Sequence, residues 1–287
     1  MLKNILRRVS KILPDNIFVR LQYKYLTKKK LNIKNPVDFN EKLQWLKLYD
    51  RNPAYTIMVD KYEVRKYIKE MIGEEYLIPL LGVWKTFEEI DFNRLPDQFV
   101  LKCTHDSNSI ILCKDKSKFD VAKARQKLNR NLKKNFYWYG REWPYRNVQP
   151  RIICEKYMVD ESGTELKDYK VLCFNGIPKL IQVDTGRFSD HKRNVYTTDW
   201  QYANVRITLP NADASSVSKP KKIDEMLSCA RILAKNIPHV RVDFYSINDR
   251  IYFGEITFFH GAGYEKFLPE SYNRLLGSWI ELPTNIN

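Results

Sequence analysis

The sequence predicts a mixed protein of the α+β (α/β) class. Two strand pairs, in residues 98–113 and 241–257, alternate Val, Ile, Phe and Tyr with polar residues and have turn-like residues between their strands. Segments of helical composition, residues 119–134 and 223–236, separate these strand pairs. The chain of 287 residues is long enough to bury a large core, either as two lobes or as one large α/β domain.

The first 35 residues are strongly basic, with ten Lys or Arg and one acid, Asp15, in a chain of formal net charge +15. We expect residues 1–55 to form a basic helical N-terminal segment. Within Met1–Leu13 the apolar residues follow helical spacing and basic residues fill the gaps, as in a helix lying on an anionic membrane surface. A terminal helix that docks on the protein's own core has the same pattern, and both interpretations stay open.

The remaining composition is that of a folded protein in water, with 44% hydrophobic and 29% charged residues. No run of eighteen apolar residues predicts a spanning helix, and no signal peptide is visible. The five cysteines lack CxxC spacing, so we expect reduced thiols in a cytoplasmic protein, with any membrane contact peripheral at the inner face. The histidines show no zinc-ligand spacing, and no nucleic-acid recognition motif is present.

After the N-terminal segment, the pattern predicts a helix, an edge strand or connector, a hairpin with a polar loop, and a second helix. These are Val59–Met71 beginning near Asp60 and Lys61, Ile78–Trp84, the strands Gln98–Cys103 and Ser109–Cys113, and Phe119–Lys134. The second half adds the strands Arg151–Glu155, Asp168–Phe174 and Ile177–Val183, the helix Ile223–Asn236, and a glycine-bearing loop at Phe258–Gly263. Asn175-Gly176 is a strong two-residue turn signal.

The late hairpin carries the most informative charges. Arg241 and Asp243 share one face of the first strand, and Glu255 and Thr257 share one face of the second. If these faces coincide, two carboxylates and an arginine project toward one point, as in sites that hold Mg²⁺ against phosphate oxygens. The alternative is an edge hairpin with solvated charges on its outer face.

Upstream residues could complete a nucleotide site. Lys61 near a helix start and Lys102 at the end of a strand are point charges suited to phosphate oxygens. The strand end Glu155-Lys156-Tyr157-Met158 could offer backbone groups to a purine. A lone surface lysine is usually only solvated, so it is the combination of these residues that favours nucleotide binding.

The order of these motifs resembles the ATP-grasp superfamily, as seen in D-alanine–D-alanine ligases, and more narrowly its TupA-like branch. The broader match rests on Asp60-Lys61, Val100-Leu101-Lys102, Glu155–Met158, Arg241-Val242-Asp243 and Glu255-Ile256-Thr257. The narrower match rests on Phe39–Trp45, Asp168-Tyr169-Lys170, Cys173–Gly176 and Phe253–Phe258. The resemblance covers roughly residues 20–285 and lies in motif order more than in any one motif.

The resemblance implies an ATP-grasp fold, in which two lobes with antiparallel sheets clasp a nucleotide. The catalytic region would span residues 56–287, with a small lobe at about 90–155 and a C-terminal metal and substrate lobe at 156–287. ATP and Mg²⁺ are the implied cofactors.

The resemblance also implies a role for each matching residue. ATP phosphates would contact Lys61, Lys102 and the loop Thr104–Ser109, including His105, Ser107 and Ser109. Adenine would meet Glu155, Lys156, Tyr157 and Met158, and the ribose would meet Asp168. Mg²⁺ would be held by Asp243 and Glu255 with Thr257 nearby. Arg241 would stabilise the acyl-phosphate stage, and with Lys102 it forms the expected catalytic pair.

Three positions depart from the family pattern. The loop His105–Ser109 lacks the expected glycines, Thr257 stands where an Asn is usual, and residue 65 is Arg. The implied activity is an ATP-dependent ligase that joins a carboxylate to an amine or hydroxyl on a cell-surface polysaccharide or its precursor. Candidates for the substrate side are Asp184, Arg187, Lys192, Arg193 and His260, although for each one taken separately a solvated loop residue is the favoured interpretation.

Two other functions stay open. A nucleotide-sugar glycosyltransferase would match the common label of the family, but the chain has no obvious DxD motif. A noncatalytic scaffold in a polysaccharide assembly complex would bind no nucleotide. The expected partners are small-molecule or glycan-linked carboxylates and amines, with no nucleic acid; the sequence fixes neither substrate identity nor oligomeric state.

Overall fold

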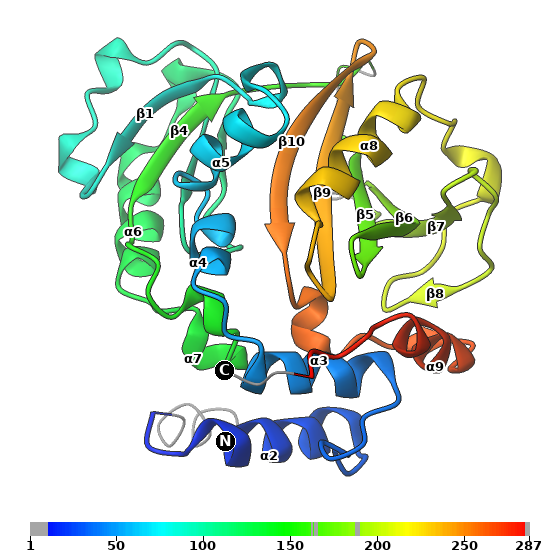
Figure 1. The fold of residues 1–287 in the computed structure, drawn as a ribbon. Coiled ribbons are helices and arrows are strands. Elements are labelled where there is room, and N and C mark those ends of the chain that lie inside the picture. Colours follow the sequence, from blue (N-terminus) through cyan, green and yellow to red (C-terminus); the bar gives the residue numbers. More distant parts are fainter. Residues whose placement is uncertain (1–10, 162, 164–165, 187–189, 285–287) are drawn as a thin grey trace.

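The structure, a computed structural model, describes residues 11–161, 163, 166–186 and 190–284. Two antiparallel sheets dominate it, with short helices between and below them (Figure 1). The smaller sheet has the strand order β1 (Leu80–Trp84), β4 (Ile152–Lys156), β2 (Phe99–Cys103) and β3 (Ile111–Cys113). The larger sheet has the order β10 (Arg250–Thr257), β9 (His239–Ile247), β5 (Asp168–Phe174), β6 (Ile177–Thr185) and β7 (Lys192–Thr197). The predicted α+β class with two lobes is confirmed.

The remaining elements surround these sheets. Strands β8 (Arg206–Ile207) and β11 (Phe267–Leu268) form a small separate ribbon. The helices are α2 (Asp15–Thr27), α3 (Phe39–Tyr49), α4 (Ala54–Val59), α5 (Val64–Met71), α6 (Val121–Leu132), α7 (Tyr137–Gly140), α8 (Ile223–Leu233) and α9 (Ser271–Ser278). Helices α2 and α3 lie below the sheets, and α4 and α5 stand between them (Figure 1).

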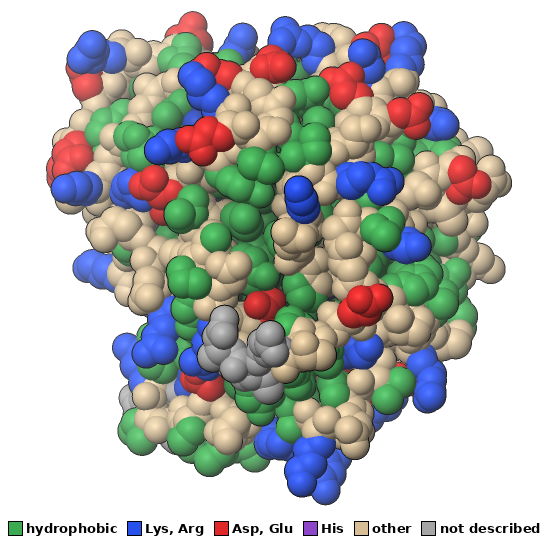
Figure 2. Space-filling model, viewed as in Figure 1, with side chains coloured by type: hydrophobic (Ala, Val, Ile, Leu, Met, Phe, Trp, Pro, Cys, Tyr) green, Lys and Arg blue, Asp and Glu red, His purple; other side chains and the backbone are tan. Residues whose placement is uncertain are grey.

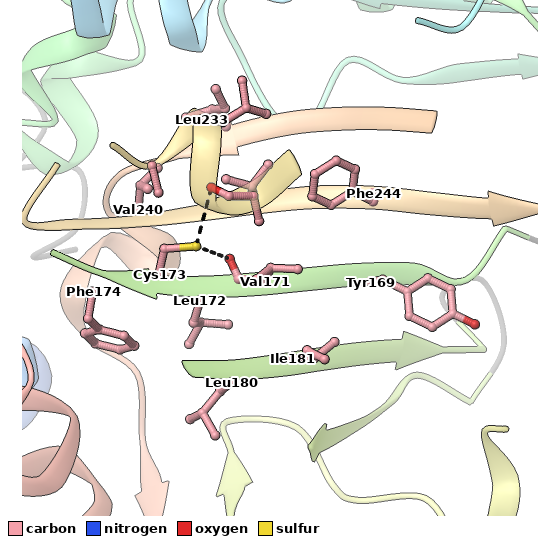
Figure 3. Packing of buried hydrophobic residues seen from close by; sticks show 14 of the residues in the cluster. Tyr169, Val171, Leu172, Cys173, Phe174, Leu180, Ile181, Leu233, Val240 and Phe244 are labelled. Atoms are coloured by element: carbon pink, nitrogen blue, oxygen red, sulfur yellow. Dashed lines mark hydrogen bonds between the residues drawn. The ribbon is translucent and has the colours of Figure 1, made fainter. Parts of the chain in front are cut away.

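The main hydrophobic core surrounds the larger sheet. Its central strand β5 is buried along its whole length, and α8 packs against one of its faces (Figure 3). Cys173 points toward that helix, with its thiol 3.9 Å from the Ala230 carbonyl oxygen. All five cysteines are buried and unpaired, as the sequence predicts for small buried hydrophobes.

Two tight turns fix the register of the larger sheet. Asn175 and Gly176 have φ angles of 48° and 79°, and Asn248 and Asp249 have φ angles of 49° and 59°. Consecutive positive φ angles are what a type I′ hairpin turn requires, and Asn, Asp and Gly tolerate them best. Both predicted hairpins of this sheet are therefore present.

The predicted helix Val59–Met71 begins later, as α5 at Val64, and the separate helix α4 ends at Val59. The chain breaks at Asp60, whose Oδ1 accepts hydrogen bonds from the backbone N–H groups of Tyr62 at 2.8 Å and Glu63 at 3.3 Å. An Asp side chain bound to the following backbone favours a turn over a continuous helix. Lys61 consequently lies in the turn between the helices and does not open one.

Helix α3 of the N-terminal segment packs against the larger sheet. Phe39, Leu43 and Leu46 of this helix are buried in the same hydrophobic cluster as that sheet. The smaller sheet includes β1, which begins at Leu80, whereas the expected small lobe spans about residues 90–155. Edge strand β1 pairs only with β4, as expected for the segment Ile78–Trp84.

Most of the helix expected within Met1–Leu13 lies outside the described residues. In the part of the chain that the structure does describe, every helix is too short or too polar to cross a lipid bilayer.

Candidate active site

Two carboxylates and a guanidinium meet on one face of the hairpin formed by β9 and β10. Asp243 and Glu255 are opposite each other in the strand register, and so are Arg241 and Thr257. Arg241 donates to both Asp243 oxygens at 2.7 Å, and its Nη2 lies 3.2 Å from Glu255 Oε1. The same Nη2 group lies 3.2 Å from Thr257 Oγ1. The faces predicted from side-chain alternation do coincide, so these charges form one cluster.

This convergence depends on a β-bulge at Gly254. The register shifts between Phe253 and Glu255, and a Cβ atom at position 254 would lie 3.1 Å from the Asp243 carbonyl oxygen. It would also lie 3.3 Å from the Tyr245 ring. Glycine therefore permits the close backbone approach that places Glu255 opposite Asp243.

The two carboxylates differ in their affinity for protons. Burial disfavours the charge of Glu255, but its pKa is lowered to about 2 by four cations, Lys61, Arg241, Lys170 and Lys102. Burial raises the pKa of Asp243 to about 6, because it outweighs the attraction of Arg241 and Lys170. Glu255 is therefore negatively charged throughout the physiological pH range, whereas Asp243 gains or loses its charge near pH 6.

Lys61 connects this hairpin to the loop of the smaller sheet. Its backbone N–H donates to the Thr104 carbonyl oxygen at 3.1 Å, and its Nζ donates to the Asp106 carbonyl oxygen at 2.6 Å. The same Nζ lies 3.7 Å from Glu255 Oε2. One lysine thus holds the predicted phosphate loop and faces the predicted metal carboxylate.

The loop Thr104–Ser109 is held by its own side chains. Ser109 Oγ accepts from the Cys103 N–H at 2.7 Å and donates to the Asp106 carboxylate. His105 Nε2 lies 3.1 Å from the Asn131 carbonyl oxygen. Hydrogen bonds of these buried side chains hold the loop in one shape, although it lacks the glycines of the family pattern.

The side chains of His105 and Ser109, both predicted as residues of the phosphate loop, are buried and bonded inside the loop. Ser107 and Asn108 are exposed, and Ser107 is the predicted residue that the structure leaves facing outward.

Lys102 and Glu155 form a close ion pair between neighbouring strands of the smaller sheet. Lys102 Nζ lies 2.6 Å from Glu155 Oε2, and Arg65 Nη1 lies 3.3 Å from Glu155 Oε1. All three side chains are largely buried. Glu155 is therefore paired with two cations, one on each carboxylate oxygen, and Arg65, which departs from the family pattern, is the second of them.

A pocket lies between the two sheets and contains most of the predicted nucleotide residues. Its lining includes Val100, Lys102, Glu155, Lys156, Tyr157, Met158 and Asp168, together with Ile78, Leu112 and Tyr245. The Lys156 N–H donates to the Pro79 carbonyl oxygen at 3.0 Å, which removes it as a donor to a purine. Tyr157 and Met158 come directly after the end of β4, and both residues line the pocket.

Sequence reasoning did not select Lys170 as a site residue. Its Nζ lies 2.8 Å from Asp168 Oδ2, 3.6 Å from Asp184 Oδ2 and 3.8 Å from Asp243 Oδ2. The Lys170 side chain is only 7% exposed. The sequence does indicate this position, because Lys170 follows Asp168 by two residues and therefore lies on the same face of the strand.

The residues considered as possible substrate contacts lie in different environments. Arg193 binds Asp184 through two hydrogen bonds, of 2.7 and 3.0 Å, on the same sheet face as Lys170. Lys192 pairs with Asp190 at 2.7 Å near the sheet rim. Arg187 lies outside the described residues.

His260 is buried, so it is neither a solvated loop residue nor exposed in an open substrate site. It is 2% exposed and packs against Phe39 and His239 at ring-centroid distances of 5.3 and 5.4 Å. Burial lowers the pKa of His260, so it is neutral and apolar in character.

The described residues contain no cluster of three or more His, Cys, Asp or Glu side chains able to hold a metal ion. The pair Asp243 and Glu255 fits Mg²⁺, which needs only one or two carboxylates when substrate phosphates supply the other oxygens. Thr257 Oγ1 lies 3.4 Å from Glu255 Oε1 and adds one hydroxyl to this donor set.

Three solved structures resemble parts of this chain. D-alanine–D-alanine ligase from Bacillus anthracis, complexed with ATP, is 14% identical with a TM-score of 0.41, over 70% of this chain and 54% of that chain. D-alanine–D-alanine ligase from Helicobacter pylori is 12% identical with a TM-score of 0.42, over 85% of this chain and 70% of that chain. A RimK domain ATP-grasp protein from Sphaerobacter thermophilus is 10% identical with a TM-score of 0.42, over 78% and 67%. The chain spans just over half the length of the first of these.

No curated protein matches the chain. A family model described as TupA-like ATPgrasp matches residues 41–281, which is most of the sequence. This range contains both sheets, the loop Thr104–Ser109 and the carboxylate hairpin. The chain therefore belongs to the TupA-like ATP-grasp family.

Proposed function

We propose that this chain is an ATP-dependent ligase that joins a carboxylate to an amine or a hydroxyl through an acyl phosphate. The observation that carries the proposal is the position of Lys61, which binds the loop of the smaller sheet and faces Glu255 of the larger sheet. Lysines and carboxylates from both lobes thereby surround one region, as binding of a triphosphate and its metal requires.

The adenine end of ATP would occupy the pocket between the sheets. Ile78, Val100 and Leu112 give it apolar walls, and the backbone after β4 offers polar groups at Tyr157 and Met158. Asp168, at the start of β5, also lines this pocket and would accept hydrogen bonds from the ribose hydroxyls. The Lys102–Glu155 pair lines the same pocket, and the ammonium group would meet phosphate oxygens.

The phosphate end would lie between Lys61 and the hairpin. Asp243 and Glu255 would hold Mg²⁺, which when bound neutralises charge on the phosphate oxygens. Lys61 and Lys102 provide fixed positive charge for the phosphates, and Arg241 is aimed at the carboxylate pair from the same strand face. Because these groups are already ordered, they need little reorganisation during phosphoryl transfer.

The chemistry requires no nucleophilic side chain. A substrate carboxylate oxygen attacks the γ-phosphorus, the bond to the β-phosphate oxygen breaks, and ADP leaves. An amine or hydroxyl then attacks the acyl carbon, loses its proton and displaces inorganic phosphate. Arg241 supports the first step electrostatically, since it can pair with the negative charge that spreads over the transferred group.

The substrate would enter along the polar face of the larger sheet. Asp184 and Arg193 lie on this face beside Lys170 and form a charged floor next to the carboxylate hairpin. Such a floor suits an acidic or amino-bearing substrate, and we propose a cell-surface polysaccharide or its precursor as the molecule modified. The five buried thiols are consistent with a reducing compartment such as the cytoplasm.

The test is an ADP-release assay across amino acids, amino sugars and acidic sugars, with products identified by mass. Wild-type protein should release ADP with one acid and acceptor pair, and Asp243→Asn and Glu255→Gln should abolish release while the circular dichroism spectrum is unchanged. Stabilisation by UDP-sugars without stabilisation by ATP would instead support a nucleotide-sugar glycosyltransferase. Absence of any nucleotide binding would support a scaffold.

A further inference from the structure

Among the described residues, helix α2 packs against the rest of the protein through one face. Phe18, Val19 and Tyr23 are buried on that inner face. Val19 and Tyr23 share a small hydrophobic cluster with Leu31, Ile33 and Leu48, separate from the core of either sheet. The inner face is therefore the face that packs against the body of the protein.

Polar contacts fix the orientation of α2. Asp15 at its start lies 2.8 Å from Arg51 and 2.9 Å from Arg141, and it accepts a hydrogen bond from Tyr137 at 2.6 Å. In its middle, Gln22 donates to the Tyr139 carbonyl oxygen at 2.9 Å. The opposite face of the helix is thus held outward in a defined position.

That outward face combines apolar and basic side chains. Ile17 and Leu21 are 44% and 48% exposed and lie one turn apart. Arg20, Lys24 and Lys28 are exposed on the same side of the helix. We name Ile17, Arg20, Leu21, Lys24 and Lys28 the α2 face.

Neutralising acids are scarce around the α2 face. Asp15, the one acid in the first 35 residues, is already paired with two arginines. Lys28 is followed by Lys29, which is paired with Glu270, and by Lys30, which is exposed and extends the basic region past the end of the helix. The α2 face therefore has a net positive charge with little internal compensation.

We propose that the α2 face binds an anionic lipid surface. Exposed Ile and Leu between basic residues match a helix that lies in the plane of a membrane, with apolar groups inserted and cations at the headgroups. A second copy of the chain is a poor occupant, because pairing two α2 faces would bring like charges together. Lipid headgroups supply the complementary charge and the apolar interior that this face needs.

The location of α2 leaves the nucleotide site accessible in the bound state. The helix lies below α3, at the edge of the molecule away from both sheets (Figure 1). Hydrophobic and basic side chains occur close together along this lower edge (Figure 2). Lipid binding by the α2 face does not depend on the proposed ligase activity. It assigns membrane contact to a defined helix, residues 15–27, and not only to the basic residues before it.

Cosedimentation of the full chain with sucrose-loaded vesicles tests the proposal. Wild-type protein should bind vesicles of phosphatidylcholine with about one third phosphatidylglycerol and should not bind pure phosphatidylcholine. The triple variant Arg20→Gln/Lys24→Gln/Lys28→Gln should bind on the order of a hundredfold more weakly, because each basic residue contributes about fivefold. The double variant Ile17→Ser/Leu21→Ser should also lose binding.

A matched control removes the same charge elsewhere. Lys123→Gln/Arg130→Gln/Lys133→Gln changes three exposed basic residues in and next to α6 and should bind almost as wild type does. A Leu21→Cys variant carries the one exposed thiol, since the native cysteines are buried, and a polarity-sensitive dye there should shift to the blue with anionic vesicles.

Three results would overturn the proposal: no binding by wild-type protein, an equal loss in the α6 control, or wild-type binding by the α2 variants. The last would assign membrane contact to residues 1–13 instead. Circular dichroism and melting temperature check that each variant is folded, which is expected because the substituted residues are exposed.

Discussion

The ammonium group of Lys61 lies 3.7 Å from the carboxylate of Glu255, although these residues come from opposite ends of the chain. Lys61 precedes the smaller sheet, and Glu255 lies on β10 of the larger one. Because Lys61 also binds the Asp106 carbonyl oxygen, the two lobes meet through this side chain. The electrostatics of the proposed site therefore depend on how the lobes are placed relative to each other.

Replacement of Lys61 by methionine should weaken MgATP binding ten- to a hundredfold. The variant loses a charge-assisted contact and the bond that holds the loop at Asp106, and each such bond contributes about 1.5–3 kcal/mol. Isothermal titration calorimetry measures the change. Lys66→Met is the control, because the Lys66 side chain is 83% exposed. Equal affinities of the two variants for MgATP would show that Lys61 does not contribute to the nucleotide site.

Asp243 should make stability depend on pH in an uncommon direction. Burial raises its folded-state pKa to about 6, so the folded protein binds the proton more tightly than the unfolded chain. The resulting stabilisation is full below about pH 4 and is lost as pH rises through 6. The stability of wild type relative to Asp243→Asn should therefore fall by about 2–3 kcal/mol between pH 4 and pH 7.

Denaturant unfolding at a series of pH values tests this expectation. Asp97→Asn, at an exposed carboxylate, controls for the loss of a negative charge. A difference between wild type and Asp243→Asn that is constant or grows with pH would contradict the assigned environment of Asp243.

Lys170→Met should destabilise the fold by about 3 kcal/mol. The lysine is buried among Asp168, Asp184 and Asp243, and its removal leaves carboxylates without their shared cation. Chemical denaturation measures the loss. Lys192→Met, at the sheet rim, should change stability by less than about 0.5 kcal/mol. A loss below about 1 kcal/mol in Lys170→Met would show that the cluster does not need this charge.

Gly254→Ala should damage both stability and nucleotide binding. The new Cβ would press on the Asp243 carbonyl oxygen at 3.1 Å, and a backbone atom in a paired strand cannot move aside without changing the register. We expect about 1–2 kcal/mol less stability and a clear loss of MgATP affinity. Thermal melting and titration calorimetry check the two effects; wild-type values in both would exclude a special role for the bulge.

The sequence predicts well those features that depend on local chemistry. The hairpins are found where Asn175-Gly176 and Asn248-Asp249 allow positive φ angles. Alternation along a strand correctly places Arg241 with Asp243, because side chains on a strand have a period of two. These rules need no information about the rest of the fold.

Features that depend on long-range packing were not predictable in the same way. The contact between Lys61 and Glu255 requires the packed lobes, and the helix break at Asp60 requires a side-chain bond to the following turn. Strand β7 (Lys192–Thr197) lacks an apolar alternation, because Arg193 is buried by pairing with Asp184 instead of by hydrophobicity. Lys170 was missed because a lysine is rarely buried, and only its three carboxylate neighbours explain its place.

A nucleotide site shared by the two sheets is best tested by the binding of MgATP to wild type, Glu255→Gln and Lys102→Met, measured by isothermal titration calorimetry. We expect one MgATP per wild-type chain and at least a tenfold loss of affinity in each variant, since one residue comes from each sheet. Absence of binding by the wild type, or wild-type affinity in both variants, would contradict a shared nucleotide site between the two sheets.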